Sequence, residues 1–347
     1  MAAALLIEEG YDVIGATMQV WPDVPEEEAA AHGGCCSVAA ATDARRVAAV
    51  LGIPHYVLNF RDLFEETVIA DFCSEYALGR TPNPCLVCNR VIKFGALLRK
   101  ARELGASFVA TGHYARVTGD PSSGRRLLLK GLDPRKAQSY ALYMLTQEQL
   151  GAAVFPLGEM RKTEVRRLAA RLGLPTADKP ESQEICFVTS GDYRDFLRRR
   201  AAGFGRPGPI LGTRGNVLGM HEGLPFYTVG QRRGLGVARG RPLYVIDIDP
   251  ARNALVVGTA AEAERREFAI AHANFIPFDR LSGPIRVTCK IRYRASEAPA
   301  TVEPLDDGRA FVRLDTPQRG VTPGQSAVFY DGDVVVGGGI IVRSVRE

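Results

Sequence analysis

The sequence lacks an apolar run long enough for a membrane helix, and its start lacks the marks of a leader. No stretch of its 347 residues approaches the roughly 18 consecutive apolar residues that such a helix needs. The opening MAAALLIEEG has neither the basic region nor the cleavage site of a signal peptide. We therefore expect a soluble cytoplasmic protein that does not bind membranes. A coiled-coil or apolar stripe is also missing, so we expect a monomer.

Histidine is scarce, and the cysteines do not form a regular, even-numbered set. Seven cysteines at irregular spacings argue against the disulfide framework of a small secreted protein. A structural zinc site needs four ligands. Beside Cys85 and Cys88 the sequence offers only the adjacent Cys35 and Cys36 and five scattered histidines. We expect no metal ligands, although a zinc half-site at Cys85 and Cys88 stays open.

Positive charge is concentrated rather than spread. Residues 1–79 carry 3 Lys or Arg against 13 Asp or Glu, whereas residues 80–136 carry 12 against 3. The basic excess begins at the cysteine pair, and such a distribution indicates a polyanionic partner such as a nucleic acid. The alternative is a solvated arginine-rich surface.

Helix and strand patterns alternate in the first part of the chain, which predicts an α/β fold with a Rossmann-like parallel sheet. Residues 62–78 have the pattern of an amphipathic helix with Leu63, Val68, Phe72 and Tyr76 inward. Glycine, proline and short strand patterns become frequent after Pro207, where PLYVIDID, a PARN turn and ALVVG predict a hairpin, and residues 266–347 are almost entirely strand and turn. We expect three domains: a catalytic α/β domain over 1–198, a small mixed linker domain over 199–264, and a C-terminal β-barrel over 265–347.

The segment TPNPCLVCNR, residues 81–90, fits a zinc half-site, a redox pair or a sulfur-handling nucleophile. We expect Cys88 to lie just before a helix that starts near Val91, close to Arg90 and Lys93. A helix N-terminus and nearby cations stabilise a thiolate. Thiol exchange needs a second sulfur, and Cys186 in the apolar triplet ICF is a candidate. We expect Cys73 and Cys289 to be structural.

Three further segments carry candidate binding groups. ATGHYAR places Gly112 and His113 after a strand, where parallel sheets bind ligands, although His113 could equally be a strand cap. VTCKIRYR, residues 287–294, alternates as a strand with three cations on one face and Tyr293 on the other, which suits a phosphate backbone or an ordinary exposed face. GQRRGLG, residues 230–236, is a basic loop without Walker-type spacing.

Taken together, these segments resemble the bacterial tRNA-specific 2-thiouridylases of the MnmA/TrmU family. The resemblance covers nearly the whole chain in order. Segments that carry it include GRTPNPCLVCNRVIKFGALL, ATGHYAR, QSYALYMLTQEQL, ESQEICFV, GLPFYTVGQRRGLG and VTPGQSAVFYDG. It implies a pyrophosphate-loop type of ATP pyrophosphatase domain, a tRNA-binding barrel and ATP-dependent 2-thiolation of the wobble uridine, position 34, through an adenylated base and an enzyme persulfide. It also implies Mg²⁺ as cofactor and a cysteine desulfurase or sulfur carrier protein as donor.

The resemblance also implies roles for individual residues. Cys88 is the nucleophile, Cys186 carries the persulfide, and the two form a transient disulfide. Met18 and Gly112 match positions that contact ATP. Residues matching positions that contact tRNA or the target base are Asn83, Pro84, Cys85, His113, Lys136, Ala137, Gln138, Arg292, Tyr293 and Gln325. Two positions depart from the family pattern, because many relatives have Asp in place of Cys85 and Asp in place of Ala137.

The family opens with a strand and a pyrophosphate-binding loop that precede the position of Met1. We therefore expect the chain as written to bind ATP weakly and to thiolate poorly, with the true start upstream. Two alternatives stay open: a non-catalytic tRNA-binding remnant, and another ATP-pyrophosphatase such as a tRNA sulfurtransferase of different base specificity.

Overall fold

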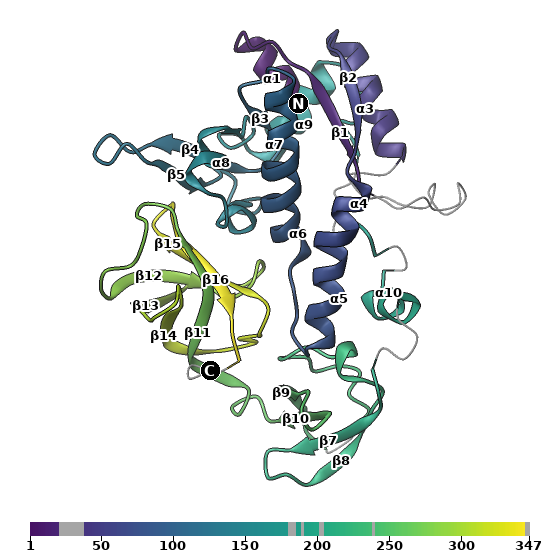
Figure 1. Cartoon of the computed structure of the whole chain (residues 1–347), viewed down its shortest axis with the longest axis vertical. Coiled ribbons are helices and arrows are strands. Elements are labelled where there is room, and N and C mark those ends of the chain that lie inside the picture. The colour runs from purple at the N-terminus through teal and green to yellow at the C-terminus, as the bar shows by residue number, and fades with distance from the viewer. Residues whose placement is uncertain (21–37, 180–184, 189–190, 201–204, 238–239, 344–347) are drawn as a thin grey trace. The chain divides into compact units, whose positions relative to one another are not determined.

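The chain forms two compact units (Figure 1). The structure is a computed structural model that describes residues 1–20, 38–179, 185–188, 191–200, 205–237 and 240–343. Unit 1 comprises Met1–Ile69, Pro84–Asp192 and Asp333–Val335, and unit 2 comprises Ala70–Asn83, Tyr193–Gly332 and Val336–Glu347. In the described ranges no helix is long and apolar enough to cross a membrane.

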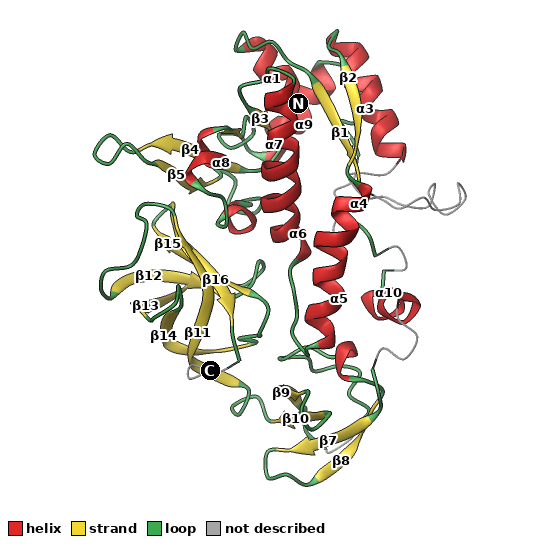
Figure 2. Cartoon of the chain, in the orientation of Figure 1, coloured by secondary structure: helices red, strands yellow, loops and turns green. Residues whose placement is uncertain are grey.

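Unit 1 alternates helices with short strands (Figure 2). Its helices are α1 Ala2–Glu8, α3 Val38–Leu51, α4 Arg61–Phe64, η1 Glu65–Ile69, α6 Pro84–Val87, η2 Cys88–Ala96, α7 Leu97–Glu103, η3 Ser139–Leu142, α8 Gln147–Gly151 and α9 Lys162–Arg171. Its strands are β1 Gly15–Gln19, β2 His55–Asn59, β3 Val109–Ala110, β4 Ala115–Gly119, β5 Arg126–Lys130 and β6 Ala153–Val154.

The strand pairs β1–β2 and β3–β6 are both parallel, with Met18 opposite Leu58 and Val109 opposite Ala153. Helix α3 packs against both strands of the first pair, as the predicted crossover requires. The α/β class is therefore confirmed. The predicted single sheet differs in one respect: within the described residues the two parallel pairs are not hydrogen-bonded to each other.

Unit 2 contains α5 and α10, which pack through aromatic rings. Its helices are α5 Ala70–Ala77, α10 Tyr193–Arg200 and η4 Leu224–Phe226. Phe72 and Tyr76 of α5, predicted to point inward, are buried and contact Phe196 and Tyr193 of α10. The Tyr76 and Tyr193 rings stack with centroids 4.7 Å apart.

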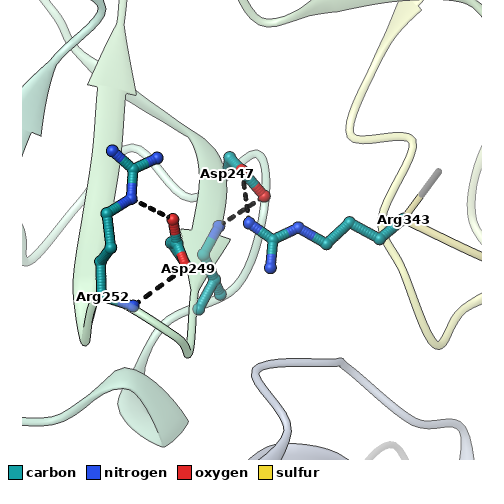
Figure 3. A network of polar contacts seen from close by, with 5 residues as sticks. Asp247, Asp249, Arg252 and Arg343 are labelled. Carbon is teal, nitrogen blue, oxygen red and sulfur yellow. Dashed lines mark hydrogen bonds and ion pairs between the residues drawn. The ribbon is translucent and has the colours of Figure 1, made fainter. Parts of the chain in front are cut away.

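A four-stranded sheet follows in the order β8-β7-β10-β9. The strands are β7 Gly208–Gly212, β8 Val217–His221, β9 Tyr244–Asp249 and β10 Ala254–Gly258. The predicted hairpin is confirmed as the antiparallel pair β9–β10. Its turn is closed by Asp249, whose carboxylate accepts hydrogen bonds from the backbone and the guanidinium of Arg252 (Figure 3). The side chain of Arg343 pairs with Asp247 on β9 at 2.8 Å (Figure 3).

The C-terminal part of unit 2 is a closed β-barrel. Its strands are β11 Glu264–Phe275, β12 Ile285–Lys290, β13 Ala298–Pro304, β14 Ala310–Arg319, β15 Ser326–Asp331 and β16 Val334–Ile341. They follow the order β11-β14-β13-β12-β15-β16, and β16 pairs with β11 to close the barrel. Apolar side chains such as Ile270, Val302, Val312 and Phe329 fill the interior. The predicted barrel is confirmed, whereas the three predicted domain boundaries stay a prediction.

Candidate active site

Cys85 and Cys88 lie on a continuous helical segment of unit 1, formed by α6 and η2. Pro84 is the first residue of α6, a position where proline is tolerated because its missing N–H has no helical partner. Cys85 is exposed, and Cys88 is half-buried at the first position of η2. The prediction that the helix starts near Val91 is therefore wrong. The first turn that the helix N-terminus influences holds Cys85, not Cys88.

The segment that carries Cys88 is a π-helix. Leu97, which ends it, donates its N–H to the carbonyl of Ile92, five residues back. Gly95 fits this wide helix because a Cβ there would lie 2.9 Å from the carbonyl oxygen of Arg90. π-Helices are rare in proteins, and those that occur are often found at functional sites. The π-helix was not among the features expected from the sequence. Gly95 within an apolar helical pattern is the signal that could have indicated it.

Two amide side chains, one in the π-helix and one in α8, connect the π-helix to other elements of unit 1. The Asn89 side chain donates from Nδ2 to the carbonyl of Ala141 at 2.8 Å and accepts from Nζ of Lys93 at 2.9 Å. The Gln149 side chain donates from Nε2 to the carbonyls of Phe94 and Arg90, at 2.9 Å and 3.2 Å. The carbonyls of Arg90 and Phe94 in the irregular helix are thus satisfied by a side chain of α8, and Asn89 ties the helix to the carbonyl of Ala141 in η3.

Gly112 is exposed after β3, and the adjacent His113 is buried. His113 is 9% exposed, lies between the rings of Phe94 and Phe155, and shares a 2.7 Å hydrogen bond through Nδ1 with Thr111. Burial, with the Lys93 charge as a smaller cause, lowers the pKa of His113 to about 3, so the ring is neutral at physiological pH. The predicted contact between His113 and tRNA stays untested, and little of this side chain is exposed.

The turn with Lys136, Ala137 and Gln138 is fixed against the residue that follows His113. Gln138 and Tyr114 exchange two hydrogen bonds: the Tyr114 N–H donates to the Gln138 side chain, and the Gln138 N–H donates to the Tyr114 carbonyl. The start of the turn is held by Asp133, whose carboxylate accepts from backbone N–H groups at both Arg135 and Lys162. These hydrogen bonds keep the pKa of Asp133 below its usual value, and the bond from the Lys162 N–H has the largest effect.

Cys186 is half-buried in unit 1, in the same unit as Cys88. The next residue, Phe187, packs edge-to-face on Phe64 of α4, with ring centroids 5.8 Å apart. Helix α4 in turn contacts η2, the helix that begins with Cys88. Neither thiol is in a disulfide. Met18, the other predicted ATP contact in this unit, lies on β1 one residue before its carboxyl end.

The predicted C-terminal contacts lie in unit 2. Gln325 donates from Nε2 to the carbonyls of Thr81 and Pro82, at 2.9 Å and 3.3 Å, directly before Asn83. Its amide therefore holds the arm that leads into the Pro-Asn-Pro turn. The Thr81 N–H adds a 2.8 Å bond to the carbonyl of Pro323.

Arg292 and Tyr293 are both exposed, but they do not lie on a strand. Strand β12 ends at Lys290, and the following turn is closed by a hydrogen bond from the Ala295 N–H to the Arg292 carbonyl. The predicted strand over 287–294 is thus too long, and Tyr293, which is 40% exposed, lies in the turn beyond it. Alternation of residue types continues into the turn although strand pairing does not.

The remaining cysteines divide as follows. Cys289 is 1% exposed in the barrel core, and burial raises the pKa of its thiol. It is structural, as predicted. Cys73 is half-buried on α5, whereas Cys35 and Cys36 lie outside the described residues. Within the described part of the chain, no cluster of three or more His, Cys, Asp or Glu side chains could hold a metal ion.

A cavity of about 310 Å³ lies in unit 2, and no predicted site residue lines it. It is lined by residues of the β9 strand and the barrel, among them Asp247, Phe268 and Arg343. Its size alone gives it no catalytic role, and Cys88 and Cys186 belong to unit 1.

Comparisons with known proteins match the whole chain. Three family models cover residues 1–190, 194–259 and 265–341, described as a tRNA methyl transferase HUP domain, a tRNA methyl transferase PRC-barrel domain and an aminomethyltransferase beta-barrel domain. Among curated proteins, the tRNA-specific 2-thiouridylase MnmA of Moorella thermoacetica is 58% identical over 341 residues, which is 98% of this chain and 95% of the relative.

Two further relatives agree. The tRNA-specific 2-thiouridylase MnmA 2 of Caldanaerobacter subterraneus subsp. tengcongensis is 55% identical over 346 residues, covering 100% of this chain and 95% of the relative. MnmA of Acetivibrio thermocellus is 54% identical over 341 residues, covering 98% and 95%.

Proposed function

The chain belongs to the MnmA family of tRNA-specific 2-thiouridylases, and from this premise we propose that Cys88 and Cys186 carry sulfur to the wobble uridine of tRNA. The activity is that of a tRNA-uridine 2-sulfurtransferase. The observation that supports these residue roles best is the pair of half-buried thiols in unit 1, linked through the contacts of Phe187, Phe64 and α4. Both thiols are in the reduced form that sulfur loading requires.

The proposed sulfur transfer balances as two exchanges. Cys186 is loaded as a persulfide, whose terminal sulfur attacks C2 of the activated uridine, and the C2–O bond breaks. The Cys88 thiolate then attacks Sγ of Cys186, the S–S bond breaks, and the sulfur stays on the base. Cys88 and Cys186 are thereby oxidised to a disulfide while the transferred sulfur is reduced. A thiol reductant must regenerate both cysteines before the next turnover.

ATP is the proposed second substrate, because a carbonyl oxygen is a poor leaving group and adenylation makes it a good one. Met18 near the carboxyl end of β1 and Gly112 just beyond β3 fit a nucleotide, since parallel strands present ligand sites at this end. Gly112 is exposed and leaves room for a backbone approach. The acidic cluster that would hold Mg²⁺ is not found among the described residues, so the ion would arrive on the ATP phosphates.

We propose that tRNA meets four groups of residues. Asn83, Pro84 and Cys85 would face the target base, and Cys85 has the exposure for it. His113 with Lys136, Ala137 and Gln138 would form a second contact, where Asp133 fixes the turn. Arg292 and Tyr293 are exposed in the barrel turn, and Gln325 would act beside the arm that it already binds. The sulfur donor would be a cysteine desulfurase or a sulfur carrier protein.

The decisive experiment is thiolation of purified tRNA by the chain with ATP, Mg²⁺ and a desulfurase, followed by mass spectrometry of the nucleosides. We expect a low level of 2-thiouridine with the unmodified chain, as its weak expected binding of ATP implies, and none with Cys88→Ser or Cys186→Ser. Unchanged product in both variants would refute the proposed roles. Binding of tRNA without any 2-thiouridine formation would instead favour a non-catalytic tRNA-binding protein.

A further inference from the structure

We infer that Asn89 is a positioning residue for Cys88: its buried amide fixes the first turn of η2 and holds the Lys93 ammonium at that turn. The inference rests on the proposed function, because it assumes that Cys88 acts as a thiolate. It concerns how the chain makes that thiolate available.

The Asn89 side chain uses both ends of its amide. The residue is 2% exposed, its Nδ2 donates to the Ala141 carbonyl, and its Oδ1 accepts from Lys93. Ala141 belongs to η3, so the bond ties the turn that begins with Cys88 to a separate element of unit 1. A carboxylate at this position could still accept from Lys93 but would face the Ala141 carbonyl with no donor.

Such external bonds support the π-helix, which is a rare form found mostly as short segments inside α-helices. Gln149 supplies a second set from α8, and the other end of its amide, Oε1, accepts from the Thr146 N–H in the capping box of α8. The orientation of the Gln149 amide is therefore fixed by two independent elements. Asn89 anchors the start of η2, and Gln149 anchors its later carbonyls.

The ammonium of Lys93 is placed by its bond to Asn89, the neighbour of Cys88 in sequence. A fixed cation near a thiol raises the fraction of thiolate, which is the nucleophilic form. The Lys93 charge acts locally in this cluster, since it contributes to the low pKa of the buried His113. Arg90, the other cation that the sequence analysis considered, is exposed and therefore more strongly screened.

The test is the alkylation rate of Cys88 by iodoacetamide in the full chain, divided by that of Cys85, and read by peptide mass spectrometry. Cys85 lies three residues earlier, on α6 and outside η2. We expect the ratio to fall about tenfold in Asn89→Ala and in Lys93→Met, which corresponds to about one pKa unit of the thiol. Lys93→Arg keeps the cation and should restore most of the ratio.

Gln149 has a matched control on the same helix. Gln147 makes the same kind of amide-to-backbone bonds, but to Arg126 on β5. Gln149→Ala should therefore lower the ratio, whereas Gln147→Ala should leave it at the wild-type value. Alkylation of the buried Cys289 measures unfolding of unit 2, and far-ultraviolet circular dichroism checks the fold of the whole chain in every variant.

An unchanged ratio in a folded Asn89→Ala variant would overturn the inference, and so would an equal decrease in Gln147→Ala. Because the measurement needs neither tRNA nor ATP, a failure of the inference can be distinguished from a failure of the proposed function. A chain that shows the expected ratios but forms no 2-thiouridine would refute the proposed function and keep Asn89 as a positioning residue.

Discussion

Cys88 and Cys289 are the same residue type in two opposite settings. Cys289 lies in a barrel core where apolar side chains exclude water and raise the pKa of its thiol. Cys88 begins an irregular helix that is fixed by amide side chains, and its neighbour Asn89 binds the Lys93 ammonium. The barrel is stabilised by burial of apolar area, whereas the π-helix combines buried apolar residues such as Ile92 and Phe94 with a few directional bonds. The comparison teaches that a reactive thiol needs placement by polar contacts, because close apolar packing would make it inert.

The largest expected effect comes from removing each thiol in turn. Cys88→Ala should lower thiolation by about a thousandfold or more, since the attacking sulfur is lost, and should leave unfolding unchanged. Cys289→Ala should do the reverse, with thiolation near wild type and a loss of about 1 kcal/mol in unfolding free energy. Thiolation assays and urea unfolding check the pair. Equal losses of thiolation in both variants would contradict the proposed difference between the roles of Cys88 and Cys289.

The next effect concerns the barrel core. Phe329→Ala removes a fully buried ring and should lower the unfolding free energy by about 3–5 kcal/mol. The urea concentration at which Cys289 becomes open to alkylation measures this loss. Below that transition, the alkylation ratio of Cys88 to Cys85 should stay at its wild-type value. A change of that ratio in the folded variant would show that the two regions are not independent.

Lowering the pH should decrease the unfolding free energy of the chain, because the buried His113 stays neutral in the folded state. Its pKa is about 3 in the folded chain, below the usual value of 6.5, so only the unfolded chain takes up a proton between these limits. The stability contributed by neutral His113 is complete above pH 6.5 and decreases as pH falls, by about 2 kcal/mol at pH 5. Urea unfolding at pH 5 and above pH 6.5 should show this decrease in unfolding free energy in wild type and a smaller decrease in His113→Phe. Identical decreases would contradict the assignment.

The smallest expected effect tests the π-helix itself. Alanine is favoured over glycine in helices by about 1 kcal/mol, yet Gly95→Ala should destabilise by about 1–2 kcal/mol because its Cβ would crowd the Arg90 carbonyl. Gly151→Ala is the control, since nothing lies within 4 Å of a Cβ there. It should be neutral or stabilising. Thermal unfolding of both variants distinguishes crowding at η2 from a general effect of alanine.

Much of the fold could be predicted because local patterns determine it. Alternation in the C-terminal segment gave the barrel strands, the PARN turn gave the β9–β10 hairpin, and helical spacing placed Phe72 and Tyr76 inward. Alternation failed beyond Lys290, because residue types that suit a strand are also found in an exposed turn. The start of α6 at Pro84 was missed for a similar reason, since proline is compatible with both a turn and a first helical position.

The sequence by itself indicated the candidate reactive groups. The thiols of Cys88 and Cys186, the glycine after β3 and the basic exposed residues follow from residue types in order along the chain. Only the tertiary structure decided how Cys88 is held, through Ala141 and Gln149, which lie more than fifty residues further along the chain. It also decided that His113 is buried and that Phe187 meets Phe64. Such contacts depend on chain folding over long separations, and no local pattern of residues encodes them.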